Sequence, residues 1–195
     1  MPLQVSAVVL AAGSSRRMGR SKQLLPLGPK PVIRHCLDSV IAAGITDIVV
    51  VLGAGSEEIK AAISGLPVRT MINGDPASDM AGSVRLGLRQ VAPDSSGVLV
   101  CLSDHPLVSP ATISAIVHAH HAFTAHVIIP AYHGRRGHPT LFPREVIGDI
   151  VRSATLRDVI TAHADTVRTL EVDDEGVVQD LDTPEDYERA RGRFS

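Results

Sequence analysis

A cluster of basic side chains directly after an apolar run is the first feature of this sequence that suggests chemistry. The run 5–10 ends in the small residues 11–13, where backbone N–H groups can approach a bulky anion closely. A strand, a tight turn and a cation cluster together predict a phosphate cradle, although an ordinary strand exit with solvated arginines has the same composition. The turn matches neither Gly-x-Gly-x-x-Gly nor the Walker pattern, so we expect a nucleotide site of another kind. The cations of this segment are Arg16, Arg17, Arg20 and Lys22.

Acidic side chains later in the chain are candidates for holding a metal ion beside that cradle. Asp104 follows the apolar run 97–102, and a carboxylate at a strand end opposite phosphates supplies the hard oxygen ligand that Mg²⁺ needs. Asp182 precedes a helix start at which Thr183 can form the cap while Asp182 faces a metal. The structural alternatives are a turn for Asp104 and a helix cap for Asp182. The sequence also leaves both Asp180 and Asp182 open as the second metal ligand.

A third candidate is the basic, glycine-containing segment 135–139. Its arginines can clamp an anionic substrate by bidentate contact, and Gly137 can permit close approach of that substrate. A surface hairpin turn explains the same residues equally well. The sequence contains no Gly-x-Ser-x-Gly elbow and no Cys–His pairing that would indicate covalent catalysis.

The composition is that of a globular protein. The 195 residues are 44% hydrophobic and 21% charged, which supports a proper core and argues against disorder. No apolar run approaches the roughly 18 residues of a membrane span, and the N-terminus lacks the basic start of a signal peptide. Cys36 and Cys101 lie far apart in apolar surroundings and predict buried, reduced thiols. We expect a single domain over residues 1–195 of a cytoplasmic protein with no membrane partner.

Charge is distributed unevenly along the chain. Six Arg or Lys residues and no acid precede Asp38, whereas nine acids and no base lie between Glu171 and Glu188 inclusive. A basic N-terminal segment suits the binding of phosphate, and an acidic C-terminal segment offers carboxylates to a cation. The net charge of −2 gives no reason to expect a nucleic-acid partner.

Strands that alternate with helices must position these groups. Apolar runs predict strands over 5–10, 47–52, 68–72, 97–102, 126–130 and 167–172. Helical spacing and start signals predict helices over 31–44, 57–63, 143–152, 154–163 and 184–191, and two more after Ser83 and Ser109. This alternation indicates an α/β fold, a three-layer αβα domain with a mostly parallel central sheet. Ligands bind beyond the carboxyl ends of such strands, which places Lys22, Asp104 and 135–138 on one edge.

Several motifs follow one another along nearly the whole chain. The first reads Leu10-Ala11-Ala12-Gly13-Ser14-Ser15-Arg16-Arg17-Met18-Gly19 and is followed by Lys22. The later ones are 24–28, Ser83 with 85–88, 103–108, 136–139 and 180–187. Together they resemble the MobA-like nucleotidyltransferases, and most closely the MocA branch, the molybdenum cofactor cytidylyltransferases.

The resemblance implies a Rossmann-like nucleotidyltransferase that moves CMP from CTP onto molybdopterin or its molybdenum-bearing form, with release of pyrophosphate. By motif match, Asp104 would bind Mg²⁺ and Asp182 would be the second metal ligand. Arg17 and Lys22 would contact the phosphates, and with Asp104 they would be the catalytic residues. The acceptor would be bordered by Arg136, Gly137 and His138. The remaining nucleotide-binding positions would be Leu10, Ala11, Ala12, Gly13, Ser14 and Ser83. A molybdoenzyme or its chaperone is compatible as a protein partner.

Two departures from the family pattern leave other functions open. The usual Gly-Asp-Gln-Pro appears as Ser103-Asp104-His105-Pro106, which changes the surroundings of the metal, and the usual Ser-rich segment appears as 79–83, which leaves the base undecided. An NAD(P)H-dependent reductase of the nicotine-blue type is one alternative. Against it, the chain lacks both the Gly-x-Gly-x-x-Gly turn and an acid about 20 residues beyond the loop. A non-catalytic maturation protein on the same fold is the other alternative.

Overall fold

The computed structural model describes residues 3–13, 21–75 and 77–194, and its central strand is β1 (Val5–Ala11). All residues of β1 are buried. Alternate side chains enter two apolar clusters on opposite faces of the sheet, with Val9 and Ala11 in one cluster and Val8 and Leu10 in the other. The continuous apolar run therefore forms a strand that is covered on both faces, as the sequence predicts.

The other strands extend this sheet on both sides of β1. They are β4 (Asp47–Gly53), β5 (Arg69–Asn73), β6 (Gly97–Leu102), β7 (Val127–Tyr132), β8 (Arg135–Arg136), β9 (Thr140–Pro143) and β10 (Val167–Glu171). Their order is β10-β7-β9-β6-β1-β4-β5, with β8 paired to β7. β1 is parallel to both β4 and β6, and β10 is parallel to β7. β9 runs antiparallel to β6 and β7. The predicted mostly parallel sheet is confirmed.

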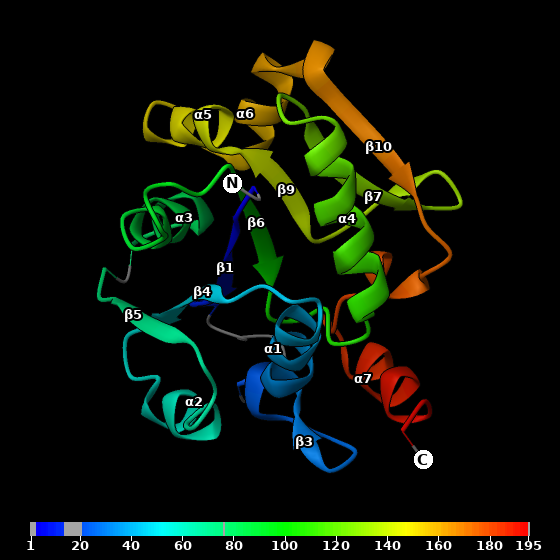
Figure 1. Cartoon of the computed structure of the whole chain (residues 1–195). Helices are drawn as coiled ribbons and strands as arrows, with labels where there is room; N and C mark the ends of the chain where they lie inside the picture. The colour runs from blue at the N-terminus through cyan, green and yellow to red at the C-terminus, as the bar shows by residue number, and fades with distance from the viewer. Residues whose placement is uncertain (1–2, 14–20, 76, 195) are drawn as a thin grey trace.

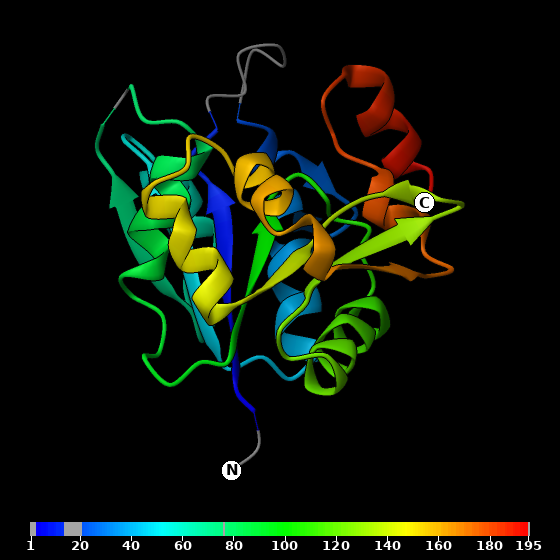
Figure 2. The same ribbon diagram turned by 90° about the horizontal axis from the view of Figure 1, so that it is seen from above.

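Helices cover both faces of the sheet and complete three layers (Figures 1 and 2). One face is covered by α1 (Val32–Ala42), α2 (Glu57–Ala62) and α4 (Pro110–Ala122). The other is covered by α3 (Met80–Leu88), α5 (Arg144–Gly148) and α6 (Leu156–Ala162). Short 3₁₀ turns η2 (Lys22–Leu24), η3 (Asp149–Val151), η4 (Ala164–Thr166) and η5 (Glu175–Val178) connect these elements. No helix in the described ranges has the length and apolar character that crossing a membrane requires.

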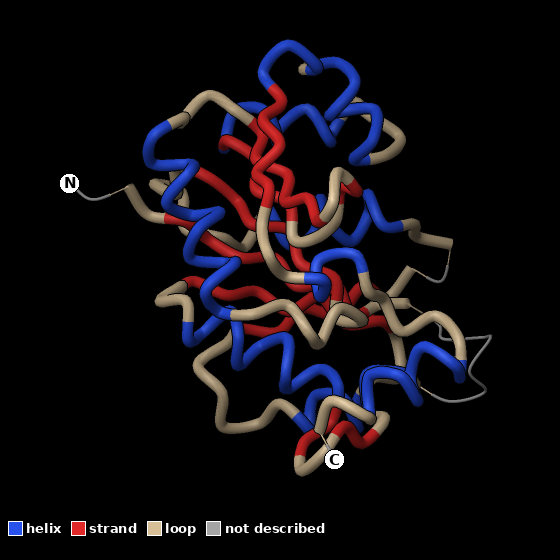
Figure 3. Tube along the Cα trace, turned by 90° about the vertical axis from the view of Figure 1, so that its right-hand side faces the viewer, coloured by secondary structure: helices blue, strands red, loops and turns tan. Residues whose placement is uncertain are grey.

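The end of the chain packs against a small hairpin of β2 (Pro26–Leu27) and β3 (Lys30–Pro31), as Figure 3 shows beside the C-terminus. The last helix is α7 (Pro184–Arg191), and the Tyr187 hydroxyl donates a hydrogen bond to the Pro26 carbonyl at 2.5 Å. A third apolar cluster joins the two segments through Leu25, Leu27, Val32, Leu181 and Ala190. This contact fixes the acidic C-terminal segment to the chain that directly follows Lys22.

Several boundaries differ from the sequence predictions for local reasons. Strand β9 was not predicted, because a four-residue segment is too short to show a strand pattern. The helix predicted over 143–152 is divided into α5 and η3. Helix α3 begins at Met80, before the predicted Ser83, because the Asp79 carboxylate caps it by accepting from the Gly82 amide at 2.8 Å.

The two cysteines behave as predicted. Both Cys36 and Cys101 are buried and free. Burial raises the pKa of the Cys101 thiol to about 12 and, helped by the charge of Asp104, raises the pKa of Cys36 well above its usual range. Neither thiol is therefore ionised near neutral pH.

Candidate functional site

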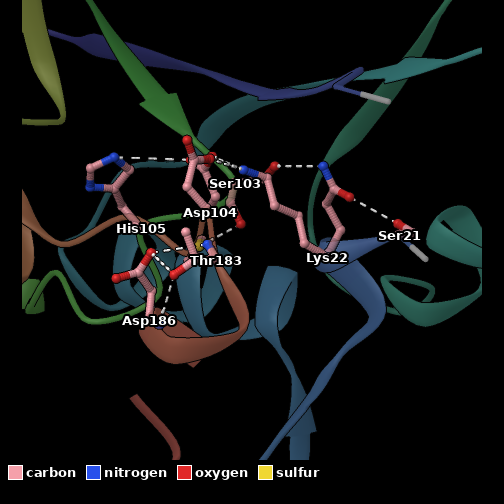
Figure 4. A network of polar contacts seen from close by, with 10 residues as sticks. Ser21, Lys22, Ser103, Asp104, His105, Thr183 and Asp186 are labelled. Atoms are coloured by element: carbon pink, nitrogen blue, oxygen red, sulfur yellow. Dashed lines mark hydrogen bonds and ion pairs between the residues drawn. The ribbon is translucent and has the colours of Figure 1, made fainter. Parts of the chain in front are cut away.

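Three charged side chains from distant parts of the sequence, Lys22, Asp104 and Asp182, meet beyond the carboxyl ends of β1 and β6. Figure 4 shows Lys22 and Asp104 among their polar neighbours. Lys22 begins the turn η2, which follows β1 after the loop. Asp104 lies two residues beyond the end of β6, and Asp182 lies two residues before α7. The parallel pairing of β1 with β6 brings the first two together, and the packing of α7 on the β2–β3 hairpin brings the third.

The ammonium group of Lys22 lies between the two carboxylates. Its Nζ donates to Asp104 Oδ2 at 2.5 Å and to Asp182 Oδ1 at 2.9 Å. The exposed fractions of the three side chains are 13%, 19% and 33% for Lys22, Asp104 and Asp182 respectively. These values are low enough that water and salt screen the charges less than on an open surface.

The two carboxylates keep Lys22 charged. Burial by itself lowers the pKa of Lys22, but hydrogen bonds and charge from Asp104 and Asp182 outweigh it, so the pKa is raised. A permanent positive charge at the carboxyl edge of the sheet suits an anionic ligand.

Asp104 still has one oxygen without compensation. Its Oδ1 atom is buried and has no hydrogen-bond partner among the residues that the structure describes. A buried carboxylate oxygen without a partner is costly unless a ligand satisfies it. Because carboxylate oxygens are the preferred ligands of Mg²⁺ and Mn²⁺, a carboxylate whose charge is incompletely compensated fits a divalent cation. No group of three or more His, Cys, Asp or Glu side chains suited to a metal occurs in the described ranges, so remaining ligands would come from substrate or water.

Backbone and buried side chains hold Asp104 in place. The Ser103 amide donates to the Leu10 carbonyl at 3.2 Å, and the Leu181 amide donates to the Asp104 carbonyl at 3.0 Å. The buried Gln23 amide donates to the Ser103 hydroxyl at 3.4 Å. The family departure at Ser103 therefore adds a polar contact between the segment of Lys22 and the segment of Asp104.

The C-terminal segment separates the two roles that the sequence left open for Asp182. Thr183 caps α7 in a capping box with Asp186, in which Asp186 accepts from the Thr183 amide at 2.9 Å and its own amide donates to Thr183 Oγ1 at 3.2 Å. Asp182 is thereby left to contact Lys22. Asp180 instead lines a groove on another side of the same segment.

The predicted nucleotide-binding residues lie in part at this edge. Leu10 and Ala11 are buried at the end of β1, whereas Gly13 is exposed beyond it. Ser83 is buried in the first turn of α3 and accepts a hydrogen bond from the Asn73 amide at 3.0 Å. Ala12 lies against the end of β4, where a Cβ added to Gly53 would approach the Ala12 carbonyl to 3.2 Å. The predictions for Ser14 and Arg17 fall outside the described residues.

The predicted acceptor segment forms the hairpin that the sequence offered as its alternative. Residues Arg135 and Arg136 make up β8, paired to β7. Arg136 is exposed and its Nε donates to Thr169 Oγ1 at 3.2 Å. A Cβ at Gly137 would collide with the Val177 carbonyl, so this glycine is required by a close approach of the chain to itself.

His138 is neutral near pH 7. Burial, with a smaller contribution from His105, lowers the pKa of His138 to about 4, against the opposing charge of Asp104. The rings of His138 and His105 meet edge to face with centroids 5.3 Å apart. His138 therefore offers an anionic acceptor a neutral ring and no positive charge.

A polar groove of about 240 Å³ lies between the hairpin and α7. Arg135 and Arg189 line it from opposite elements, and Gln179 and Asp180 lie between them in the chain segment that leads to Asp182. Adjacent residues of a strand point to opposite faces, so Arg135 reaches this groove while Arg136 reaches Thr169. Arg189 was not predicted from the sequence, because an arginine in a mixed-charge helix has no distinguishing pattern.

Comparison with known proteins places this site in a familiar context. Residues 7–167 match the family model that is described as the MobA-like NTP transferase domain. The chain is 28% identical over 197 residues to nicotine blue oxidoreductase from Paenarthrobacter nicotinovorans, with 95% of each protein covered. It is 34% identical over 124 residues to the bifunctional protein GlmU of Sorangium cellulosum, where the match covers 59% of this chain and only 26% of that protein.

Solved structures are similar over nearly the full length. Rv0371c from Mycobacterium tuberculosis H37Rv superposes with a TM-score of 0.86 at 32% identity, covering 98% of this chain and 99% of that one. A complex of Rv0371c with manganese gives a TM-score of 0.81 at 30% identity, covering 98% and 100%. A nucleotidyl transferase from Methanothermobacter thermautotroptrophicus superposes with a TM-score of 0.84 at 25% identity. The match covers 98% of this chain and 97% of that one.

Proposed function

The chain belongs to the family of MobA-like NTP transferase domains, and we propose that it transfers CMP from CTP onto a molybdopterin-type acceptor with release of pyrophosphate. Nucleotidyl transfer is the activity of the family. The choice of CTP and of the acceptor rests on the resemblance of the sequence motifs to the MocA branch. The observation that carries the proposal is the position of Lys22 between Asp104 and Asp182, at the edge of the sheet where ligands bind.

A divalent cation is part of this proposal. Asp104 and Asp182 would hold it, and a related protein has been crystallised with manganese. When bound, the cation would neutralise charge on the phosphates and so favour departure of pyrophosphate. Two carboxylates with oxygens from phosphate and water are the usual ligands of Mg²⁺, which we propose as the physiological ion.

The reaction needs no activated serine or cysteine. A phosphate oxygen of the acceptor attacks the α-phosphorus of the nucleotide, the new P–O bond forms, and the bond to the β-phosphate oxygen breaks. Lys22 would contribute a point charge beside the phosphates, and the buried backbone of Asp104 would hold its carboxylate in line. Positioning and electrostatic stabilisation are the main sources of rate in phosphoryl-group transfer.

The acceptor would lie on the side of Asp182 that faces the hairpin. The groove there has two arginines, Arg135 and Arg189, for a phosphate, and Gln179 and Asp180 for the polar edge of a heterocycle. Its lining also includes Glu175 and Asp186, and Asp186 pairs with Arg189 at 3.5 Å. The predicted acceptor residues Arg136, Gly137 and His138 belong to the same hairpin or directly follow it. We propose Arg135 as the hairpin residue that contacts the acceptor phosphate.

Pyrophosphate release tests the proposed function. Purified protein is incubated with Mg²⁺, molybdopterin and each of CTP, GTP, ATP and UTP, and pyrophosphate is measured. We expect CTP to give the highest kcat/KM, and Arg135→Ala to raise the KM for molybdopterin while the KM for CTP is unchanged. Arg136→Ala is the matched control on the opposite face of the hairpin. An absence of pyrophosphate with every nucleotide would refute the proposal.

A reductase is the second candidate, because nicotine blue oxidoreductase aligns over 95% of both chains. It predicts that NADPH raises the melting temperature and that CTP does not. The absence of the Gly-x-Gly-x-x-Gly turn makes transferase activity the better supported proposal. A thermal-shift comparison of CTP with NADPH decides between them.

A further inference from the structure

We propose that Lys22 acts as an internal counter-ion that closes the cation site, so that the site takes up a divalent metal together with a triphosphate and excludes the free ion. This inference rests on the proposed function, because it specifies the form in which metal and nucleotide enter the same site. The juxtaposition that carries it is one ammonium group held by both candidate metal ligands.

In this geometry, a free ion would compete with Lys22 for its ligands. Asp104 Oδ2 and Asp182 Oδ1 are both bonded to Lys22 Nζ, at 2.5 and 2.9 Å. The remaining oxygen of Asp104, Oδ1, is covered by protein. A cation held by Asp104 and Asp182 would therefore compete with the ammonium group for these oxygens.

The charge of the ammonium group opposes a divalent ion placed beside it. Lys22, Asp104 and Asp182 together carry a net charge of −1, since one ammonium faces two carboxylates. A divalent ion added beside the ammonium would experience repulsion at short range in a partly desolvated site. If the lysine instead left without a new partner, its charge would lose two hydrogen bonds. Binding of a free metal ion is therefore opposed either by repulsion from the ammonium group or by the loss of its hydrogen bonds.

A triphosphate removes both costs at once. Its oxygens complete the coordination of the metal, and they offer the displaced ammonium a new set of acceptors. The lysine can move without rearrangement of its backbone, because the adjacent Gln23 is buried and bonded to Ser21 at 2.8 Å and to Ser103 at 3.4 Å. Only the flexible four-carbon stem of Lys22 has to swing.

The decisive experiment measures Mn²⁺ binding in the absence of nucleotide, by the loss of the free-Mn²⁺ EPR signal. We expect Lys22→Met to bind Mn²⁺ at least tenfold more tightly than the wild type, although this variant lacks the lysine that serves the phosphates. Lys22→Arg keeps the positive charge and should bind Mn²⁺ as weakly as the wild type. Lys30→Met is the matched control, because Lys30 pairs with Asp38 at 2.6 Å on the exposed surface.

A second measurement uses the wild-type protein alone, so that it does not depend on the folding of a variant. The melting temperature is recorded with Mn²⁺, with CTP and with both. We expect the shift with both ligands to exceed the sum of the separate shifts, because each ligand supplies what the other needs. A shift with Mn²⁺ alone as large as with both would overturn the inference.

The two proposals fail in different ways. Equal Mn²⁺ affinity of the wild type and Lys22→Met overturns the counter-ion role, even if pyrophosphate release is normal. Absence of pyrophosphate with every nucleotide overturns the proposed function, whereas the Mn²⁺ comparison without nucleotide still decides whether Lys22 competes with the metal.

Discussion

Asp47 and Asp104 lie at opposite edges of the same parallel sheet, and each belongs to an ion pair. Asp47 begins β4, and its carboxylate accepts hydrogen bonds from the Ser6 hydroxyl at 2.5 Å and the Ala92 amide at 2.7 Å. It also pairs with Arg69. Asp104 follows β6 and has Lys22 on one oxygen, whereas the other has no hydrogen bond within the ranges described and lies 4.0 Å from His105 Nε2.

The comparison shows how surroundings divide structural from reactive carboxylates. At the amino edge, both oxygens of Asp47 accept hydrogen bonds from Ser6, Ala92 and Arg69, so the carboxylate is committed to the fold. At the carboxyl edge, Asp104 accepts a hydrogen bond from the flexible Lys22 side chain and keeps one oxygen without a hydrogen bond within the described ranges. The first arrangement contributes stability, whereas the second keeps binding capacity for a ligand.

The largest expected effect is the loss of activity in Asp104→Asn. We expect kcat for pyrophosphate release to fall on the order of 10²-fold or more, because a neutral amide is a poor ligand for a divalent cation. The free energy of unfolding, measured in urea, should change by less than about 1 kcal/mol, because Lys22 keeps its contact with Asp182. Full activity of this variant would end the distinction between the two aspartates.

Asp47→Asn should give the opposite pattern. Its loss of charge weakens the bonds from Ser6 and Arg69, and we expect a loss of about 2 kcal/mol of stability. The kcat of the folded fraction should stay within about twofold of the wild type, because Asp47 lies at the far edge of the sheet. Urea denaturation and steady-state kinetics of the same preparation measure both quantities. A large fall in kcat at unchanged stability would contradict the structural role.

The structural role of Asp47 should also appear in the dependence of stability on pH. Burial raises the pKa of Asp47, but the Ala92 amide, Ser6 and Arg69 outweigh it, so the folded-state pKa lies below the unfolded value of about 3.9. The stability from this group is present above the unfolded pKa and is lost as pH falls through the folded pKa. Between about pH 5 and pH 3, the melting temperature of the wild type should fall more than that of Asp47→Asn. Parallel curves would show that Asp47 does not contribute.

The smallest expected effect concerns Thr183, which isolates the cap from the site. Thr183→Ala removes the hydroxyl of the capping box of α7, and we expect a loss of about 1 kcal/mol of stability. Activity should fall only slightly, because Asp182 contacts Lys22 independently of the cap. A fall in kcat comparable to that of Asp104→Asn would show that the cap and the site are one unit.

Sequence reasoning predicts the parts of this protein that depend on local patterns. The apolar run of β1, the Ser109 and Thr183 caps and the bounds of α7 all follow from side-chain periodicity and capping chemistry. The family motifs also identify Lys22, Asp104 and Asp182 as members of one site, although not the docking of α7 that brings Asp182 there.

The remaining features depend on contacts between distant segments. The meeting of Lys22 with Asp182 requires α7 to pack on the β2–β3 hairpin, and no pattern in either segment indicates that docking. The insertion of β9 between β6 and β7 is a matter of sheet topology. Gly137 is the clearest example. The sequence shows that this position is a glycine, but it does not show whether the space serves a ligand or the Val177 carbonyl.

The bond between Lys22 and Asp182 also has a consequence for biosynthesis, because it spans 160 positions of the chain. At roughly 5–20 residues per second, the ribosome makes the second partner about 8–32 s after the first. Contacts of such long range form late in folding, since the intervening chain must first be ordered. A nascent chain therefore exposes Lys22 well before Asp182 is made, and it acquires a complete site only after Asp182 has been synthesised.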